Sequence, residues 1–218
     1  MKHFILFYCK APIGEGGELY RSIYDLSHAC KKCGTGATLQ GQLRTIRLGK
    51  VSKEFFETLD GDFIVSKSLY NYLKEEGLKL GELNRIVNFK NIELPFYHLY
   101  STLTLPPARK KDGFTVENQC PECKRNGYFC TAIFSHPDSN RPTKILPYDL
   151  HYQPSDMEIF NQIDFAFTWE CMGLSNLKAH GNFVVRYARP LLVVSEKFKL
   201  TLEKLKIKGV EFEQIIID

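Results

Sequence analysis

The chain has 218 residues, of which 44% are hydrophobic and 13% aromatic, which is ample for a packed core and excludes a disordered protein. Its formal net charge of +4 is mild and disfavours a domain held on nucleic acid mainly by phosphate contacts. No apolar segment approaches the ~20 residues that span a bilayer, and the N-terminus lacks the features of a signal peptide. We therefore expect one domain over residues 1–218, located in the cytoplasm and without membrane contact.

The first half of the chain predicts strands at four places, where aromatic and β-branched residues cluster or alternate with polar ones: residues 3–9, 43–48, 83–89 and 96–100. Between them, Phe63-Ile64-Val65 predicts a buried strand that runs into Ser66, the N-cap of a helix. Apolar residues then recur at helical spacing until Gly77, which ends the helix. Further along, Arg109-Lys110-Lys111 is interpreted as a solvated loop.

The second half predicts a strand at 128–134 that carries Cys130, and then an irregular, proline-rich connection at 135–154. A short helix leading into a strand is expected over 159–169, followed by strand material from 183 to 194 that Pro190 interrupts. Ser195 again follows a buried-type strand and predicts a second helix N-cap.

These two strand–serine–helix segments predict an internal repeat, at about 62–89 and 191–217. Phe63-Ile64-Val65-Ser66 corresponds to Leu192-Val193-Val194-Ser195, and the apolar helix positions correspond as well: Leu69 to Phe198, Leu73 to Leu202, and Leu78 to Ile207. The alternative is two similar strand–helix elements that arose by chance, since such units are common. The predicted fold class is α+β (mixed α/β), a two-lobed body with two strand–helix–strand units clamped by a Cys₄ zinc site.

Two Cys-x-x-Cys pairs provide that predicted site: Cys30 with Cys33, and Cys120 with Cys123. One such pair is ambiguous between zinc binding and thiol–disulfide exchange, but two form the usual Cys₄ set for tetrahedral zinc. Gly34 follows the first pair and suits its tight turn, whereas Lys124 stands at that position in the second. The alternative is a set of reduced, buried cysteines.

The long separation of 30–33 from 120–123 predicts a structural zinc that joins distant parts of one fold, because four thiolates leave no open position for water or substrate. Cys130 and His28 are close enough in sequence to replace one ligand, and Cys9 and Cys171 are expected in the core. The sequence contains no zinc-protease, deaminase, P-loop or nucleophile-elbow motif. We expect no catalytic residues, no small-molecule substrate and no enzymatic activity.

Taken together, these residues resemble the double-CXXCG motif immunity proteins of myxobacterial swarming-inhibition and polymorphic toxin systems. The resemblance is carried by segments spread over most of the chain: Cys30-Lys31-Lys32-Cys33-Gly34, Cys120-Pro121-Glu122-Cys123, Ile64-Val65-Ser66, and the tail from Val193-Val194-Ser195 through Gly209-Val210-Glu211-Phe212. Lys124 departs from the CXXCG form. The resemblance implies a non-enzymatic bacterial protein that binds and neutralises a cognate toxin domain in the cytoplasm.

A zinc-ribbon-like nucleic-acid-binding protein is the alternative function. The Cys₄ set and the run Arg109-Lys110-Lys111 favour this alternative, and the mild net charge opposes it. The residues that bind a partner are not identified by any motif, but we expect the interface to use exposed aromatic residues outside the zinc site, first in the Phe96–Tyr100 segment and in the proline-rich connection at 135–154.

Overall fold

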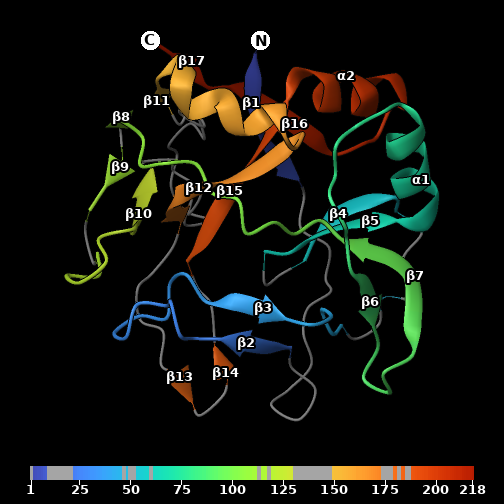
Figure 1. The fold of residues 1–218 in the computed structure, drawn as a ribbon, viewed down its shortest axis with the longest axis horizontal. Helices are drawn as coiled ribbons and strands as arrows, with labels where there is room; N and C mark the ends of the chain where they lie inside the picture. The colour runs from blue at the N-terminus through green and yellow to red at the C-terminus, as the bar shows by residue number, and fades with distance from the viewer. Residues whose placement is uncertain are drawn as a thin grey trace, which may run out of the picture.

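A computed structural model describes residues 2–8, 22–45, 48, 53–58, 61–111, 114–116, 119–129, 149–172, 179–180, 183–184 and 188–218. It confirms the mixed α+β fold class, with sheet predominating (Figure 1). Within the described residues, no helix combines the length and the apolar character needed to cross a membrane.

The helices are α1 (Lys67–Glu75), α2 (Glu196–Lys204) and the 3-10 helix η3 (Pro154–Asn161). The strands of the first half are β1 (His3–Tyr8), β2 (Ile23–Asp25), β3 (Thr38–Gln40), β4 (Phe55–Glu57), β5 (Phe63–Ser66), β6 (Arg85–Val87), β7 (Glu93–His98) and β8 (Lys110–Lys111). Those of the second half are β9 (Phe114–Thr115), β10 (Asn126–Phe129), β11 (Leu150–Tyr152), β12 (Phe165–Met172), β13 (Ala179–His180), β14 (Phe183–Val184), β15 (Arg189–Ser195), β16 (Val210–Gln214) and β17 (Ile216–Ile217).

The first lobe is a four-stranded sheet in the order β4-β5-β7-β6, with α1 between β5 and β6 in sequence. β7 lies between β5 and β6 and is antiparallel to both, so β5, α1 and β6 form a split β-α-β unit. Side chains of β5 alternate between two apolar clusters, because successive strand residues face opposite sides of a sheet. Val65 packs in one cluster and Ile64 in the other.

The second lobe repeats this arrangement within a six-stranded sheet ordered β16-β1-β15-β12-β10-β9. α2 connects β15 to β16, and the strand between them is β1, which is again antiparallel to both. In the first lobe the middle strand follows β6 along the chain, whereas in the second lobe the N-terminal segment supplies it. The second lobe is therefore a circularly permuted copy of the first.

Strand register matches between the lobes as well as topology. Corresponding paired positions are Phe55, Val65, Tyr97 and Arg85 in the first lobe, and Phe165, Val194, Phe4 and Gln214 in the second. Each helix begins at the predicted serine. The Ser66 hydroxyl accepts from Leu69 N–H at 3.1 Å, and the Ser195 hydroxyl accepts from Phe198 N–H at 3.2 Å. The prediction of two serine-capped helices is confirmed.

One apolar core joins the lobes. It contains Leu69 and Leu73 from α1 together with Phe198 and Leu202 from α2, all at most 1% exposed. The two helices lie side by side in Figure 1, and Lys204 Nζ reaches Glu76 Oε1 at 2.8 Å between them. The opposite face of each sheet is covered separately, by residues of the 43–48 segment in the first lobe and by η3 and β11 in the second.

Four sequence interpretations are wrong. Residues 135–154 were expected to form an irregular connection, but Leu150–Tyr152 forms β11, which pairs with β8 and β17, while residues 135–148 lie outside the described residues. Residues 43–48 were expected to form a strand, but in the described part of that segment only an isolated bridge joins Arg44 to Val87, while Leu43 and Leu48 pack on a sheet face. Residues 109–111 are not a solvated loop: Lys110 and Lys111 form β8, and Lys111 Nζ binds the fully buried Glu170 at 3.1 Å. Pro190 does not interrupt β15, because it lies inside the strand next to a register shift against β12.

Candidate metal centre

Each Cys-x-x-Cys pair lies in the connection of a two-stranded antiparallel hairpin. Cys30 and Cys33 lie between β2 and β3, and Cys120 and Cys123 lie between β9 and β10. We call these connections the first and second knuckle. The whole first lobe is inserted between the two knuckles in the sequence.

The two knuckles have the same backbone turn. The N–H after the second cysteine donates to the carbonyl of the first cysteine, from Gly34 to Cys30 at 2.7 Å and from Lys124 to Cys120 at 3.0 Å. Both donor residues have positive φ, 71° for Gly34 and 52° for Lys124. Glycine adopts this region readily and lysine does so at a cost, so the second knuckle keeps the geometry despite the less suitable residue.

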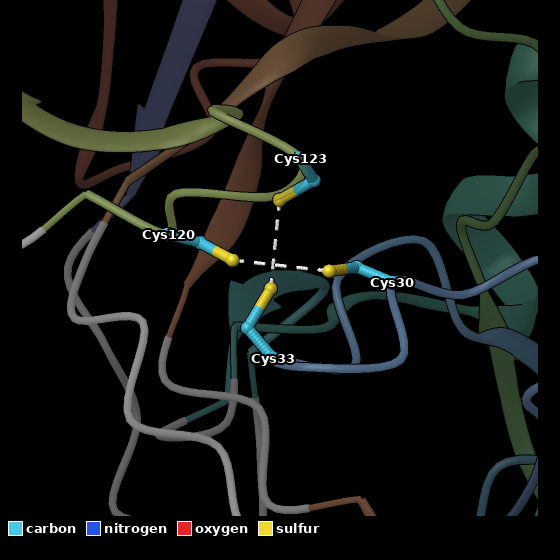
Figure 2. Close-up of side chains that lie close together, drawn as sticks. All are labelled: Cys30, Cys33, Cys120 and Cys123. Carbon is cyan, nitrogen blue, oxygen red and sulfur yellow. Dashed lines mark hydrogen bonds between the residues drawn. The ribbon is translucent and has the colours of Figure 1, made fainter.

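The four sulfurs converge between the knuckles, as Figure 2 shows, and all lie within 4.8 Å of one another. Cys30 Sγ is 3.8 Å from Cys120 Sγ, and Cys33 Sγ is 3.5 Å from Cys123 Sγ. A tetrahedral ion with about 2.3 Å metal–sulfur bonds requires edges of about 3.8 Å between sulfurs. A disulfide needs about 2.05 Å, and these cysteines are free. The arrangement fits one metal ion held by four thiolates.

The thiol pKa values differ across the cluster. Burial raises the pKa of Cys120, but hydrogen bonds from the backbone N–H groups of Cys123 and Glu122 outweigh it and lower the pKa to about 7. Burial is the largest cause of the raised pKa values of Cys33 and Cys123. A divalent cation would deprotonate all four thiols. Four thiolates around a divalent ion carry a net charge of −2, and exposed lysines at 31, 32 and 124 adjoin the ligands in sequence.

Contacts around the knuckles attach them to different lobes. The first hairpin contacts the first lobe. Leu39 N–H donates to the hydroxyl of Tyr100, just after β7, at 3.1 Å, and the Leu39 side chain packs against the apolar cluster that the 43–48 segment forms with the first-lobe sheet. The second knuckle is tied to the second lobe: Cys120 N–H donates to buried Asn126 at 2.8 Å, and β10 pairs with β12. A metal bound here would link the two lobes.

The sequence also predicts two alternative ligands, His28 and Cys130, and two core residues, Cys9 and Cys171. His28 is exposed and is not part of the sulfur cluster. Cys130 and Cys9 lie outside the described residues. Cys171 is 3% exposed in β12 and is a core residue, as expected.

Sequence reasoning missed a pocket of about 200 Å³ beside the first knuckle, where the two lobes meet, which is lined by both polar and apolar side chains. Asp62 and His98, which are 5% and 3% exposed, line this pocket, and His98 Nε2 lies 3.3 Å from Asp62 Oδ1. Arg125 and Arg189 line it as well. No spacing pattern could have identified these residues, because separate strands and turns bring them together only in the folded chain.

The structure therefore brings the four predicted cysteines together in a geometry that can bind a metal ion, and an ion with four sulfur ligands would have no open coordination position. Comparisons with protein-family models, with curated proteins and with solved structures found no significant match to this chain.

Proposed function

We propose that this chain is an immunity protein that binds and neutralises a cognate toxin domain in the cytoplasm, and that its bound metal is a structural zinc. One observation carries the proposal: the two Cys-x-x-Cys pairs, which mark the resemblance to the double-CXXCG immunity proteins, meet in one closed four-sulfur cluster. Zinc is the metal proposed because four thiolates in a tetrahedral set favour it.

A metal that links the two lobes supports a binding role, because a scaffold held rigid before association loses less conformational entropy on binding. A tight complex with a toxin domain would bury on the order of 1,200–2,000 Å². A few buried aromatic or arginine anchors carry most of the energy in such interfaces.

The Phe96–Tyr100 segment, a natural first candidate for the interface from its aromatic content, does not suit that role. Phe96 and His98 are buried in β7, an inner strand of the first lobe. The turn between β6 and β7 is a better candidate, since Phe89 and Ile92 are 47% and 56% exposed there. Asn88 Oδ1 accepts from Lys90 N–H and Ile92 N–H at 2.8 and 3.0 Å, which fixes the turn.

Co-expression with candidate toxin domains encoded by neighbouring genes is the test. We expect growth to be rescued at equimolar levels and to fail when the toxin is in excess, and we expect a stoichiometric complex on gel filtration. Phe89→Ser with Ile92→Ser should weaken the complex without unfolding the protein, and Leu200→Ser, at an exposed apolar position on α2, is the matched control. If trace amounts protect against a large molar excess of toxin, the protein turns over a substrate and the proposal is wrong.

Nucleic-acid binding is the second candidate, favoured by the exposed lysines on the two knuckles at 31, 32 and 124. Three phosphate contacts would give a slope of about −3 for log K against log salt concentration. Fluorescence anisotropy with generic DNA and RNA across a salt series measures that slope. Under the immunity proposal we expect no binding of this kind, and a slope near −3 that Lys31→Gln reduces would favour the second candidate.

A further inference from the structure

The four cysteines of the metal centre form two close pairs, and each pair joins the first knuckle to the second. Cys30 Sγ lies 3.8 Å from Cys120 Sγ, and Cys33 Sγ lies 3.5 Å from Cys123 Sγ, as the dashed lines in Figure 2 show. A disulfide has an S–S length of about 2.05 Å, so each pair needs an approach of less than about 2 Å to form one. The thiols are therefore placed for disulfides between the knuckles.

Each pair combines one accessible and one buried cysteine. Cys30 and Cys123 are half-buried, whereas Cys33 and Cys120 are each 1% exposed. Oxidation-sensitive thiols are typically accessible to solvent and have a second thiol beside them that resolves the first oxidation product. In both pairs this resolving thiol comes from the other knuckle.

The two buried sulfurs are positioned by contacts within their own knuckles. Cys33 Sγ lies 3.1 Å from the hydroxyl of Thr35, and Cys120 Sγ accepts hydrogen bonds from the backbone N–H groups of Glu122 and Cys123. The backbone of each knuckle is also closed by the turn described above. Each buried sulfur is thus held next to its partner across the cluster.

We propose that the metal centre is also a site of reversible oxidation, where a peroxide converts the pairs Cys30–Cys120 and Cys33–Cys123 into two disulfides that link the knuckles. The proposal rests on the metal site proposed above and is independent of the identity of any toxin. Disulfides in reducing compartments are usually of this transient, redox-sensing kind.

The chemistry balances for each pair with one molecule of hydrogen peroxide. The accessible thiolate attacks one peroxide oxygen, so that an S–O bond forms, the O–O bond breaks and hydroxide leaves. The thiolate of the other knuckle then attacks the sulfenic sulfur, which forms the S–S bond and displaces a second hydroxide. Two thiolates lose two electrons and the peroxide gains them. When both pairs have reacted, no thiolate remains to bind a metal ion, but the knuckles stay joined.

A disulfide between the knuckles differs in its effect from one within a knuckle. The cysteines of each proposed pair are 90 residues apart in the chain, whereas those of one Cys-x-x-Cys pair are separated by only two residues. A cross-link that closes a longer loop restricts the unfolded chain more. The oxidised protein should therefore be more stable than reduced protein without metal.

Peptide mapping identifies the pairs. Metal-loaded protein is oxidised with hydrogen peroxide, and its remaining thiols are blocked. Trypsin cleaves after Lys31 and Glu-C protease after Glu122, so the two cysteines of each knuckle end in different peptides. We expect each first-knuckle peptide to be linked to its proposed second-knuckle partner, with release of about one zinc per chain. Disulfides within the knuckles, or zinc release without disulfides, overturn the proposal.

The same digest of oxidised protein that was first stripped of metal tests the pairing separately from the metal. Purified protein without zinc would contradict the metal assignment, and the mapped pairs would still support or overturn the cross-links.

Cys30→Ser distinguishes the two possible pairings. Under the proposal, Cys33 still pairs with Cys123, and Cys120 remains a free thiol. Pairing within the knuckles would instead give a disulfide between Cys120 and Cys123, which overturns the proposal. Cys171, a core residue that is 3% exposed and outside the cluster, is the internal control and should remain a thiol throughout.

Thermal unfolding of the wild type gives a second readout. We expect the oxidised protein to have a higher Tm than the reduced, metal-free protein, and we expect dithiothreitol with zinc to restore the Tm of the metal-loaded form. An oxidised protein that is no more stable than the reduced, metal-free protein overturns the proposal, because a link between the knuckles must stabilise the fold.

Discussion

The two lobes have the same topology and register but obtain their middle strand differently. In the first lobe, β7 follows β6 through a short turn, so the whole sheet is local in sequence. In the second lobe, β1 comes from the start of the chain and β15 and β16 from its end, and Ile215 N–H donates to His3 O across that junction. The same arrangement of strands and helix therefore forms with two different chain connectivities. This indicates that the arrangement depends on strand register and on the capped helix, and not on how the loops connect the strands.

The two lobes also differ in the residues that contact their N-cap serines, although one backbone contact is shared. The residue before β4 is Glu54 and the residue before β12 is Asp164, and the backbone carbonyls of both accept from the N-cap serine, at 2.7 and 2.9 Å. Asp164 makes further contacts, because its carboxylate accepts from Ser195 Oγ and from Lys79 N–H of the first lobe. The second lobe thus provides a buried polar link to the first.

Removal of the metal should have the largest effect, because the four cysteines join a hairpin of one lobe to a hairpin of the other. We expect about one zinc per chain in the purified protein by elemental analysis, and its loss in Cys33→Ser and Cys123→Ser. Loss of the metal should destabilise the fold strongly, because structural zinc contributes on the order of 10 kcal/mol in small zinc-binding domains. Cys171→Ala, at a buried cysteine outside the cluster, is the control and should keep the metal. Wild type that is metal-free and fully folded contradicts this prediction.

The second prediction compares the two serine caps. Ser66→Ala should cost about 1 kcal/mol, the usual loss of an N-cap. Ser195→Ala should cost about 2–3 kcal/mol, because Ser195 is 1% exposed and also donates to Asp164, whose buried carboxylate would lose that donor. Chemical denaturation of both variants measures the difference. Equal costs would show that the Ser195–Asp164 bond adds nothing, and a Ser68→Ala variant controls for the hydroxyl contact beside Ser66.

Sequence patterns predicted the two capped helices and the two cysteine turns because each of these signals lies within a short stretch of the chain. A strand that runs into serine and then into residues at helical spacing specifies a capped helix within about a dozen positions, and Cys-x-x-Cys specifies a turn within four. The repeated segments and the four cysteines were found for that reason.

Features that depend on contacts between distant segments were not predicted. Strands such as β2, β8 and β9 have two or three residues, too few to show a period. Nothing near Lys111 indicates that its partner is Glu170, and nothing near Phe4 indicates that it pairs between β15 and β16. The alternation in 43–48 suggested a strand, but the same pattern also suits a segment that packs its apolar residues on the face of a sheet.

The third prediction concerns pH and only the second lobe. His3 lies opposite Ser195 in β15, at the position that Phe96 occupies opposite Ser66. Burial, and then the charge of the N-terminal amino group, lower the pKa of His3 to about 4. The unfolded chain therefore binds more protons between about pH 6.5 and pH 4, so stability is full above that range and falls as the pH decreases through it.

His3→Phe gives the second lobe the residue of the first and should flatten this part of the Tm–pH profile. Thermal unfolding between pH 4 and 8 measures it. His151→Phe is the control. His151 binds Asp218 and lies outside the repeated unit, so this variant should keep the decline in Tm below pH 6.5. A His3→Phe profile as steep as that of wild type contradicts the assignment to His3.

The smallest expected difference is at the helix C-termini, which have the same hydrogen bonds in both lobes. Leu78 N–H donates to Leu73 O at 3.0 Å, and Ile207 N–H donates to Leu202 O at 3.1 Å, so each helix ends in a Schellman motif. The residue with positive φ is Gly77 in the first lobe, at 73°, and Lys206 in the second, at 54°.

Because glycine has no Cβ to clash in this region, Gly77→Ala should cost about 1 kcal/mol, and Lys206→Gly should add up to about 1 kcal/mol of stability. Lys208→Gly makes the same substitution two residues further on, where φ is not positive, and should give no gain. Chemical denaturation with all three variants separates the local effect of the left-handed residue from a general effect of glycine. If Lys206→Gly destabilises the protein as much as Lys208→Gly does, the lysine makes a contribution in the second lobe that its equivalence to Gly77 does not explain.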